Sequence, residues 1–133
     1  MLTAKLHRVR TTEVNLDYEG SVAIDRALLE AADIREYEQI HIYNVANGER
    51  FTSYAVAAAP HSGTIAVLGA AARKVSVGDI LIICTYAELD EDEVASHKPR
   101  LVYVGGDNRI TQTRNAVQAL PARLAGKGAG SEA

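Results

Sequence analysis

The sequence predicts a mainly β protein, a small barrel or sandwich with short helices. Six stretches of alternating or β-rich composition recur with short turns between them, over residues 3–11, 38–46, 50–58, 64–68, 79–88 and 99–105. A strong hairpin signal joins the second of these stretches to the third. With 133 residues, 47% of them hydrophobic, the chain can enclose one core of its own.

The first stretch begins close to the N-terminus. Its period-2 pattern places Lys5 and His7 on one face of the expected strand. Between the first and second stretches, residues 25–34 carry apolar side chains at helical spacing, and Asp25 is placed to cap the first turn. We therefore expect a helix there, directly after the Gly-Ser pair at positions 20 and 21.

The hairpin signal is Asn47-Gly48, because both residue types tolerate the positive φ angles of a two-residue turn. The strand that follows should place Arg50, Thr52 and Tyr54 on one face. Ser53 should then point to the opposite face.

The C-terminal part of the chain has a weaker pattern. Residues 109–124 could form a loose helix, and the small and polar residues from 126 to 133 suggest a disordered tail. We therefore expect a barrel over residues 1–108 and a partly disordered extension over residues 109–133.

Composition excludes several classes of function. A net charge of −3 predicts no basic surface for nucleic acid, and from the lack of a long apolar run we expect neither a membrane span nor a signal peptide. The single cysteine, Cys84, lies in an apolar strand pattern and reads as a buried small hydrophobe. Four histidines without metal-ligand spacing argue against a metal site. A cytoplasmic location is the simplest expectation.

The pair Gly20-Ser21 is where the chain could cut itself. Glycine accepts backbone conformations that a Cβ forbids, so the peptide could be strained and open to attack by the Ser21 hydroxyl. Attack gives an ester, β-elimination gives dehydroalanine, and hydrolysis gives a pyruvoyl group and ammonia. The products would be fragments 1–20 and 21–133. Taken alone, a Gly-Ser pair is more often a turn, in which Ser21 is only a capping hydroxyl.

Several further segments occur together with this pair, in one order and at unrelated spacings: Lys5 to Val9, Tyr18 to Ser21, Asn47 to Phe51, Tyr54-Ala55, Gly69 to Ala72 and Val77 to Ile80. In these segments the chain resembles the pyruvoyl-dependent aspartate 1-decarboxylase family over roughly residues 1–108. The resemblance implies a double-psi β-barrel that assembles as a homotetramer, with active sites between neighbouring protomers. It also implies conversion of L-aspartate to β-alanine and carbon dioxide, a step of pantothenate biosynthesis.

The same resemblance assigns roles to residues. Ser21 would become the pyruvoyl cofactor, without pyridoxal phosphate, and Tyr54 would return a proton to the substrate. Processing would involve Gly20, Ser21 and Ser53, where serine stands in place of the usual threonine but keeps the hydroxyl. The residues implied to bind substrate are Lys5, His7, Tyr18, Arg50, Ser53, Gly69, Ala70 and Ala71. Arg50 offers a fork that matches a carboxylate.

Three departures from the family pattern stand out. Leu68 occupies a position where asparagine is typical, Arg73 one where histidine is common, and the loop over residues 59–64 is unusual. We expect these departures to lie around one part of the pocket. They leave two alternatives open, namely a pyruvoyl decarboxylase of another small amino acid and a barrel that does not process and only binds.

Overall fold

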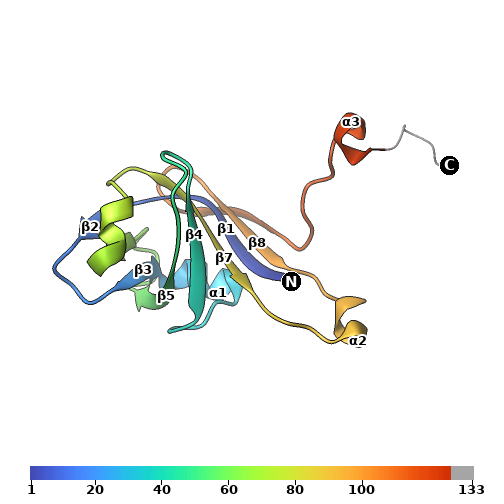
Figure 1. The fold of residues 1–133 in the computed structure, drawn as a ribbon, viewed down its shortest axis with the longest axis horizontal. Coiled ribbons are helices and arrows are strands. Elements are labelled where there is room, and N and C mark those ends of the chain that lie inside the picture. Colours follow the sequence, from blue (N-terminus) through green and yellow to red (C-terminus); the bar gives the residue numbers. More distant parts are fainter. Residues whose placement is uncertain (127–133) are drawn as a thin grey trace.

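The computed structural model describes residues 1–126, which form a curled sheet with short helices at its ends (Figure 1). Its strands are β1 (Leu2–Arg10), β2 (Glu13–Asn15), β3 (Ser21–Asp25), β4 (Gln39–Asn44), β5 (Arg50–Ala58), β6 (Ile65–Leu68), β7 (Ile80–Tyr86), β8 (Arg100–Val104) and β9 (Ile110–Arg114). The helices are α1 (Arg26–Ala32), the 3-10 helix η1 (Gly69–Lys74), α2 (Glu91–Val94) and α3 (Ala122–Ala125).

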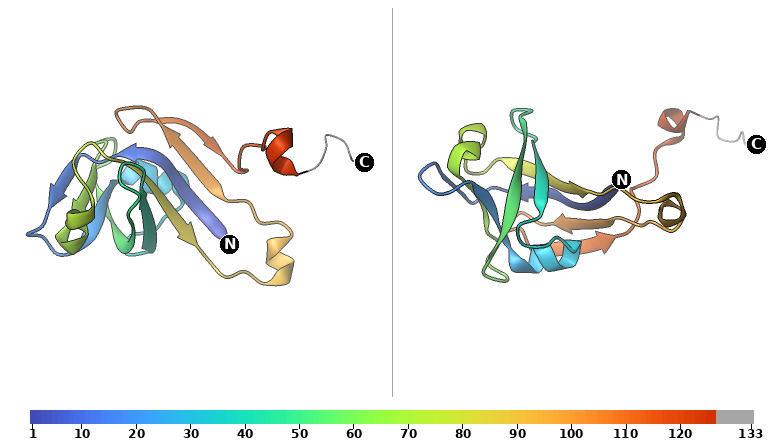
Figure 2. Two further views of the ribbon diagram at one scale, coloured as in Figure 1. Left: turned by 45° about the horizontal axis from the view of Figure 1, so that its top comes forward. Right: turned by 60° about the horizontal axis from the view of Figure 1, so that its bottom comes forward.

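The strands hydrogen-bond in the order β2-β6-β3-β5-β4-β7-β1-β8-β9. Three neighbouring pairs are parallel, namely β1 with β8, β2 with β6 and β3 with β5, and the others are antiparallel. Figure 2 shows the strands wrapping around a common interior, while α3 projects away from it. The expected mainly β class is confirmed, and the mixed pairing is that of a double-psi β-barrel.

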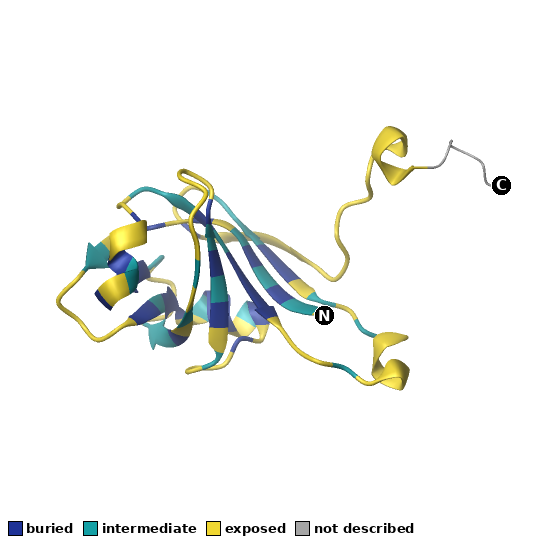
Figure 3. Ribbon diagram, in the orientation of Figure 1, coloured by how far each residue is buried: buried dark blue, intermediate teal, exposed yellow. Residues whose placement is uncertain are grey.

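The core lies inside this curled sheet. Buried and more exposed residues alternate along the strands, as Figure 3 shows, because successive side chains point to opposite faces. The largest fully buried side chains are aliphatic: Leu6, Ile24, Leu28, Ile40, Ile42, Ile65, Leu81, Ile83, Leu101, Val9, Val22 and Val67. Packing of branched side chains between strands from both ends of the chain holds the barrel together.

All six expected strands are confirmed, as β1, β4, β5, β6, β7 and β8. The expected helix is confirmed as α1, where the Asp25 carboxylate accepts a hydrogen bond from the Ala27 backbone N–H at 2.8 Å. This capping bond supplies a partner for an N–H at the start of the helix, which has none within the helix itself.

The hairpin between β4 and β5 is confirmed, but its turn is longer than expected. Five residues, 45–49, separate the strands, and the Gly48 N–H donates to the Asn44 carbonyl at 2.8 Å. Gly48 has a positive φ of 77°, whereas Asn47 does not. The two-residue turn is therefore wrong, although Tyr43 and Arg50 still pair across the hairpin.

The segment after Asn108 differs from the expected loose helix. Residues 110–114 form β9, which pairs antiparallel with β8, and only residues 122–125 are helical. The tail expected to be disordered lies, apart from Gly126, outside the described residues. The division of the chain at residue 108 stays a prediction.

Candidate active site

Arg50 and Tyr54, two of the predicted site residues on β5, lie on the outer side of the sheet. Val22 and Ala55 are fully buried and face the core, so their neighbours along each strand face outward. Arg50, Thr52 and Tyr54 are all exposed, whereas the residues between them are partly buried. The face expected for these three side chains is confirmed.

Ser21 is the first residue of β3 and is only 6% exposed. The antiparallel pairing of β3 with β6 sets Ser21 directly opposite Leu68. On its other side β3 runs parallel to β5, in a register that carries Ser21 beside Tyr54. A Cβ built on Gly69 would lie 2.5 Å from the Gly20 Cα, so the backbones of these two glycines also lie close together here. We call this group the Ser21 cluster: Gly20, Ser21, Tyr54, Leu68 and Gly69.

Two local expectations about the Gly-Ser pair are wrong. Ser21 begins a strand, and β3 separates it from α1, so the helix does not follow the pair directly. Gly20 does not have a positive φ, and a Cβ built there would come no closer than 4.0 Å to another atom, the Leu68 carbonyl oxygen. The backbone at position 20 is therefore open to residues other than glycine.

The other residues expected near the cleavage point lie at different depths. Ser53 is half-buried on the inner side of β5, and Tyr18 is 61% exposed in the loop before Gly20. Ala70 is exposed and Ala71 is half-buried in η1, which starts directly after β6. The turn that begins at Gly69 thus lies next to the Gly-Ser pair.

A second group of polar and aromatic side chains lies further along the outer face. The guanidinium carbon of Arg50 is 4.0 Å from the centre of the Tyr43 ring, a cation–π contact. The hydroxyls of Tyr43 and Tyr86 are 2.8 Å apart, and the Tyr86 ring meets His41 edge to face. Lys5 on β1 lies opposite Cys84 on β7, and Cys84 lies opposite His41 on β4, so Lys5 is aligned with this group across the sheet. We call this group the Arg50 cluster: Lys5, His41, Tyr43, Arg50 and Tyr86.

Two groups in and beside the Arg50 cluster have raised pKa values. Burial raises the pKa of the Tyr86 hydroxyl, and the hydrogen bond with Tyr43 adds to the shift. Burial also raises the pKa of the Cys84 thiol, against the opposing influence of its hydrogen bond with Tyr86 and of Lys5 and Arg50. Both groups are neutral at pH 7, as unperturbed tyrosine and cysteine side chains are, and neither offsets the positive charges of Lys5 and Arg50, which suit an anionic ligand.

His7 lies two residues beyond Lys5 on the same face of β1. Its ring meets Tyr103 edge to face at 5.3 Å between centres. Its Nδ1 atom is buried and has no hydrogen-bond partner within residues 1–126. Burial lowers the pKa of His7, and the charges of Lys5 and Arg8 lower it further, so the neutral imidazole is favoured.

The two clusters do not meet within one chain. Arg50 and Tyr54 are four residues apart on β5, which is about 13 Å along a strand. Lys5 is four strands away from Ser21 in the sheet order, or about 19 Å measured along the curved sheet. A four-carbon amino acid spans only about 5 Å. One chain therefore presents two halves of the predicted site on separate parts of its surface.

The chain's relatives identify the family. The family model described as aspartate decarboxylase matches residues 1–111. The chain belongs to the aspartate decarboxylase family. The aspartate 1-decarboxylase of Methylobacillus flagellatus is 62% identical over 94% of this chain and 97% of its own length. That of Methylococcus capsulatus is 62% identical over 88% of this chain and 93% of its own. The resemblance read from the sequence is confirmed.

Among solved structures, this chain matches the crystal structure of the rationally designed mkDPBB_sym_86 protein. It is 18% identical and covers 66% of this chain and 96% of its own, with a TM-score of 0.43.

Among the departures from the aspartate decarboxylase pattern, Leu68 lies in the Ser21 cluster, directly opposite Ser21 and half-buried. An aliphatic side chain can neither donate nor accept a hydrogen bond there. Arg73 is exposed on η1. Leu68 is therefore the departure placed to influence chemistry at Ser21 in the same chain.

The unusual loop over residues 59–64 lies elsewhere. It joins the end of β5 to the start of β6, next to Asp25 at the opposite end of β3 from Ser21. Ser21 and Asp25 are about 13 Å apart along that strand. The expectation that all three departures surround one part of the pocket is wrong within this chain.

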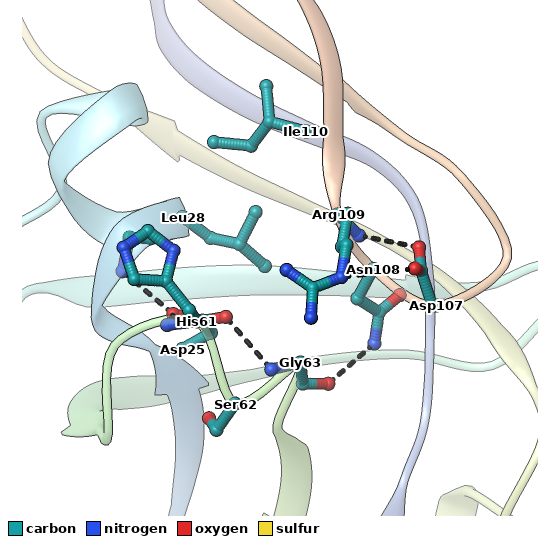
Figure 4. Close-up of a pocket in the computed structure, with 10 residues that line it drawn as sticks. Asp25, Leu28, His61, Ser62, Gly63, Asp107, Asn108, Arg109 and Ile110 are labelled. Atoms are coloured by element: carbon teal, nitrogen blue, oxygen red, sulfur yellow. Dashed lines mark hydrogen bonds and ion pairs between the residues drawn. The ribbon is translucent and has the colours of Figure 1, made fainter.

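A hollow of about 500 Å³ lies beside that loop (Figure 4). Within it the Asp25 carboxylate accepts hydrogen bonds from the backbone N–H groups of His61 and Gly63, both at 2.9 Å. The Asn108 side-chain amide donates to the carbonyls of Gly63 and Arg10, both at 2.8 Å. Because the buried carboxylate and amide already have protein partners, this network anchors the loop.

Among residues 1–126, no group of three or more histidine, cysteine, aspartate or glutamate side chains is arranged to hold a metal ion. In the same part of the chain, no helix has the length and apolar character needed to cross a membrane.

Proposed function

We propose that this chain is the precursor of an aspartate 1-decarboxylase, which converts L-aspartate to β-alanine and carbon dioxide for pantothenate biosynthesis in the cytoplasm. The observation that carries the proposal is the Ser21 cluster. It contains a buried serine directly after a glycine, with a tyrosine beside it on the neighbouring strand. The relatives named aspartate 1-decarboxylase support the choice of substrate.

Self-cleavage would generate the cofactor from Ser21. The Ser21 hydroxyl attacks the Gly20 carbonyl carbon, the peptide C–N bond breaks, and the amine nitrogen takes up the hydroxyl proton, leaving an ester. Loss of the Ser21 α-proton and cleavage of the C–O bond then release Gly20 as a carboxylate. Water replaces the nitrogen at position 21, which leaves as ammonia. The pyruvoyl group so formed supplies an electron sink for decarboxylation.

Two neighbouring side chains of β5, Tyr54 and Ser53, have proposed roles in this chemistry. The Tyr54 hydroxyl, beside Ser21 on the outer face, donates a proton to the substrate α-carbon after carbon dioxide leaves. Ser53 retains a hydroxyl that can polarise the Gly20 carbonyl during processing. Gly69, Ala70 and Ala71 form the turn whose small side chains leave room for substrate.

The Arg50 cluster would hold the substrate carboxylate that is retained. Because it is about 13 Å or more from the Ser21 cluster in the same chain, we propose that a neighbouring protomer contributes it. Lys5, His7 and Arg50 of one chain would then face Ser21 and Tyr54 of another, within a homotetramer of cleaved chains. Such an assembly also covers part of the outer face of the sheet.

Two measurements on the purified protein test the proposed function. Intact mass spectrometry should find fragments 1–20 and 21–133, the second with a blocked N-terminus. An assay with several small amino acids should show β-alanine formed from L-aspartate as the preferred reaction. Cleavage with preference for a different amino acid supports the first alternative, and an intact, inactive chain supports the non-processing barrel.

Replacing Arg50 with lysine tests its proposed contact with the substrate. Lysine keeps the charge but loses the bidentate fork, so we expect kcat/KM to fall about 10-fold, with a raised KM and normal self-cleavage. Arg114→Lys is a matched control, because Arg114 also lies over a tyrosine ring, Tyr103, but on exposed β9. If Arg50→Lys has the same steady-state kinetics as the unaltered enzyme, Arg50 does not contact the substrate.

Replacing Leu68 with asparagine tests the departure opposite Ser21. Asparagine can donate and accept a hydrogen bond there, and one such bond is worth about 2- to 10-fold in rate. We expect faster self-cleavage, a stronger preference for aspartate, or both, measured by time-resolved mass spectrometry and substrate competition. If neither quantity improves, the Leu68 side chain does not act on the chemistry at Ser21.

A further inference from the structure

Gly69 lies close to the backbone of Gly20 in the Ser21 cluster. It is the first residue of η1, directly after β6, with φ at +75°, and it is buried. A Cβ built on Gly69 would lie 2.5 Å from the Gly20 Cα, 2.8 Å from the Gly20 nitrogen and 3.0 Å from the Tyr18 carbonyl oxygen. All three atoms belong to the backbone, so no side-chain rotation can relieve the overlap.

A side chain at position 69 would overlap the Gly20 backbone, but a side chain at position 20 would overlap nothing. A Cβ on Gly20 would meet only the Leu68 carbonyl oxygen, at 4.0 Å, which is ordinary van der Waals contact. The conformation of the Gly-Ser segment therefore requires glycine at position 69, some fifty residues away in the sequence, and tolerates a side chain at position 20. Together with the Ser21–Leu68 pairing, Gly69 supports residues 18–21 along one side.

We propose that Gly69 is a positioning residue for self-cleavage, because its missing side chain lets the Gly20 backbone lie where the Ser21 hydroxyl can attack it. This inference rests on the proposed cleavage at Gly20-Ser21. A methyl group at position 69 would reach ordinary contact at 3.4 Å only if Gly20 moved by about 1 Å. A displacement of that size costs about 100-fold in a reaction that depends on near-attack geometry.

The test compares Gly69→Ala with Gly48→Ala. Gly48 has nearly the same φ, +77°, but no atom within 4 Å of its would-be Cβ, so both variants carry the same backbone strain and differ in the contact. Each chain is made by cell-free synthesis, and conversion to fragments 1–20 and 21–133 is followed by intact mass. We expect cleavage about 100-fold slower in Gly69→Ala and changed by less than about 3-fold in Gly48→Ala.

A second measurement separates positioning from folding. Hydroxylamine cleaves the ester that precedes elimination, so hydroxylamine-dependent cleavage reports how often Gly20 and Ser21 reach the attack geometry. We expect this signal to fall with Gly69→Ala. In the Ser21→Ala background, which cannot cleave, Gly69→Ala should still give a chain of native size with a β-type circular dichroism spectrum.

Three results decide the inference. Cleavage of Gly69→Ala as fast as that of Gly48→Ala overturns it. Loss of the native fold in the Ser21→Ala background also overturns it, because Gly69 would then serve the barrel and not the cleavage. If the unaltered chain is never cleaved, the proposed function fails. If the unaltered chain and the Gly69→Ala chain are cleaved equally well, the proposed function stands and only the inference about Gly69 fails.

Discussion

Ser21→Ala should yield a single chain of 133 residues that forms no β-alanine. Without the hydroxyl, the Gly20 carbonyl has no nucleophile at the next residue, so neither the ester nor the pyruvoyl group can form. Because Ser21 is 6% exposed and alanine is smaller, the barrel should accept the change. Intact mass spectrometry and the β-alanine assay measure both effects.

The matched control is Ser76→Ala, because Ser76 is exposed in the turn before β7. This variant should cleave completely and retain full activity. Continued cleavage of Ser21→Ala between residues 20 and 21 would mean that another nucleophile cuts the chain, and the proposed origin of the cofactor would be wrong.

The sequence predicts most of the barrel, and its failures have a common cause. The confirmed strands carry an alternating or apolar pattern that is visible locally. Strand β3 has the sequence Ser-Val-Ala-Ile-Asp, which includes weak strand formers, and it becomes a strand because β5 and β6 pair with it on both sides. Strand β9 is exposed throughout and depends in the same way on β8. Pairing between distant segments is not encoded in a local pattern.

The same distinction holds for the candidate site. Alternation along β5 is enough to place Arg50 and Tyr54 on one face. It cannot give the order of strands, which puts β4 and β7 between β5 and β1 and so separates Lys5 from Ser21. The requirement for glycine at position 69 likewise depends on a contact with Gly20 that only the folded chain creates.

Mixing two inactive variants should restore activity if the site is shared between protomers. Ser21→Ala keeps Arg50 but makes no cofactor, whereas Arg50→Ala should still cleave because it keeps both the Gly20 carbonyl and the Ser21 hydroxyl that attacks it. In co-assembled oligomers formed from equal amounts, a cofactor from one chain meets an intact Arg50 of its neighbour in about a quarter of the sites. We therefore expect about a quarter of normal activity from co-expressed chains, where each variant alone has almost none.

The experiment depends on the separate positions of the Arg50 cluster and the Ser21 cluster in one chain. Within one chain the Arg50 guanidinium lies over Tyr43 on β4, while Ser21 lies on β3 between β5 and β6, so the two clusters occupy different parts of the sheet. Mixing the variants after each has assembled separately is the control, because stable homo-oligomers exchange no chains and should stay inactive. Co-expressed chains that form mixed oligomers without any recovered activity would show that each active site uses Arg50 and Ser21 of the same chain, or does not use Arg50.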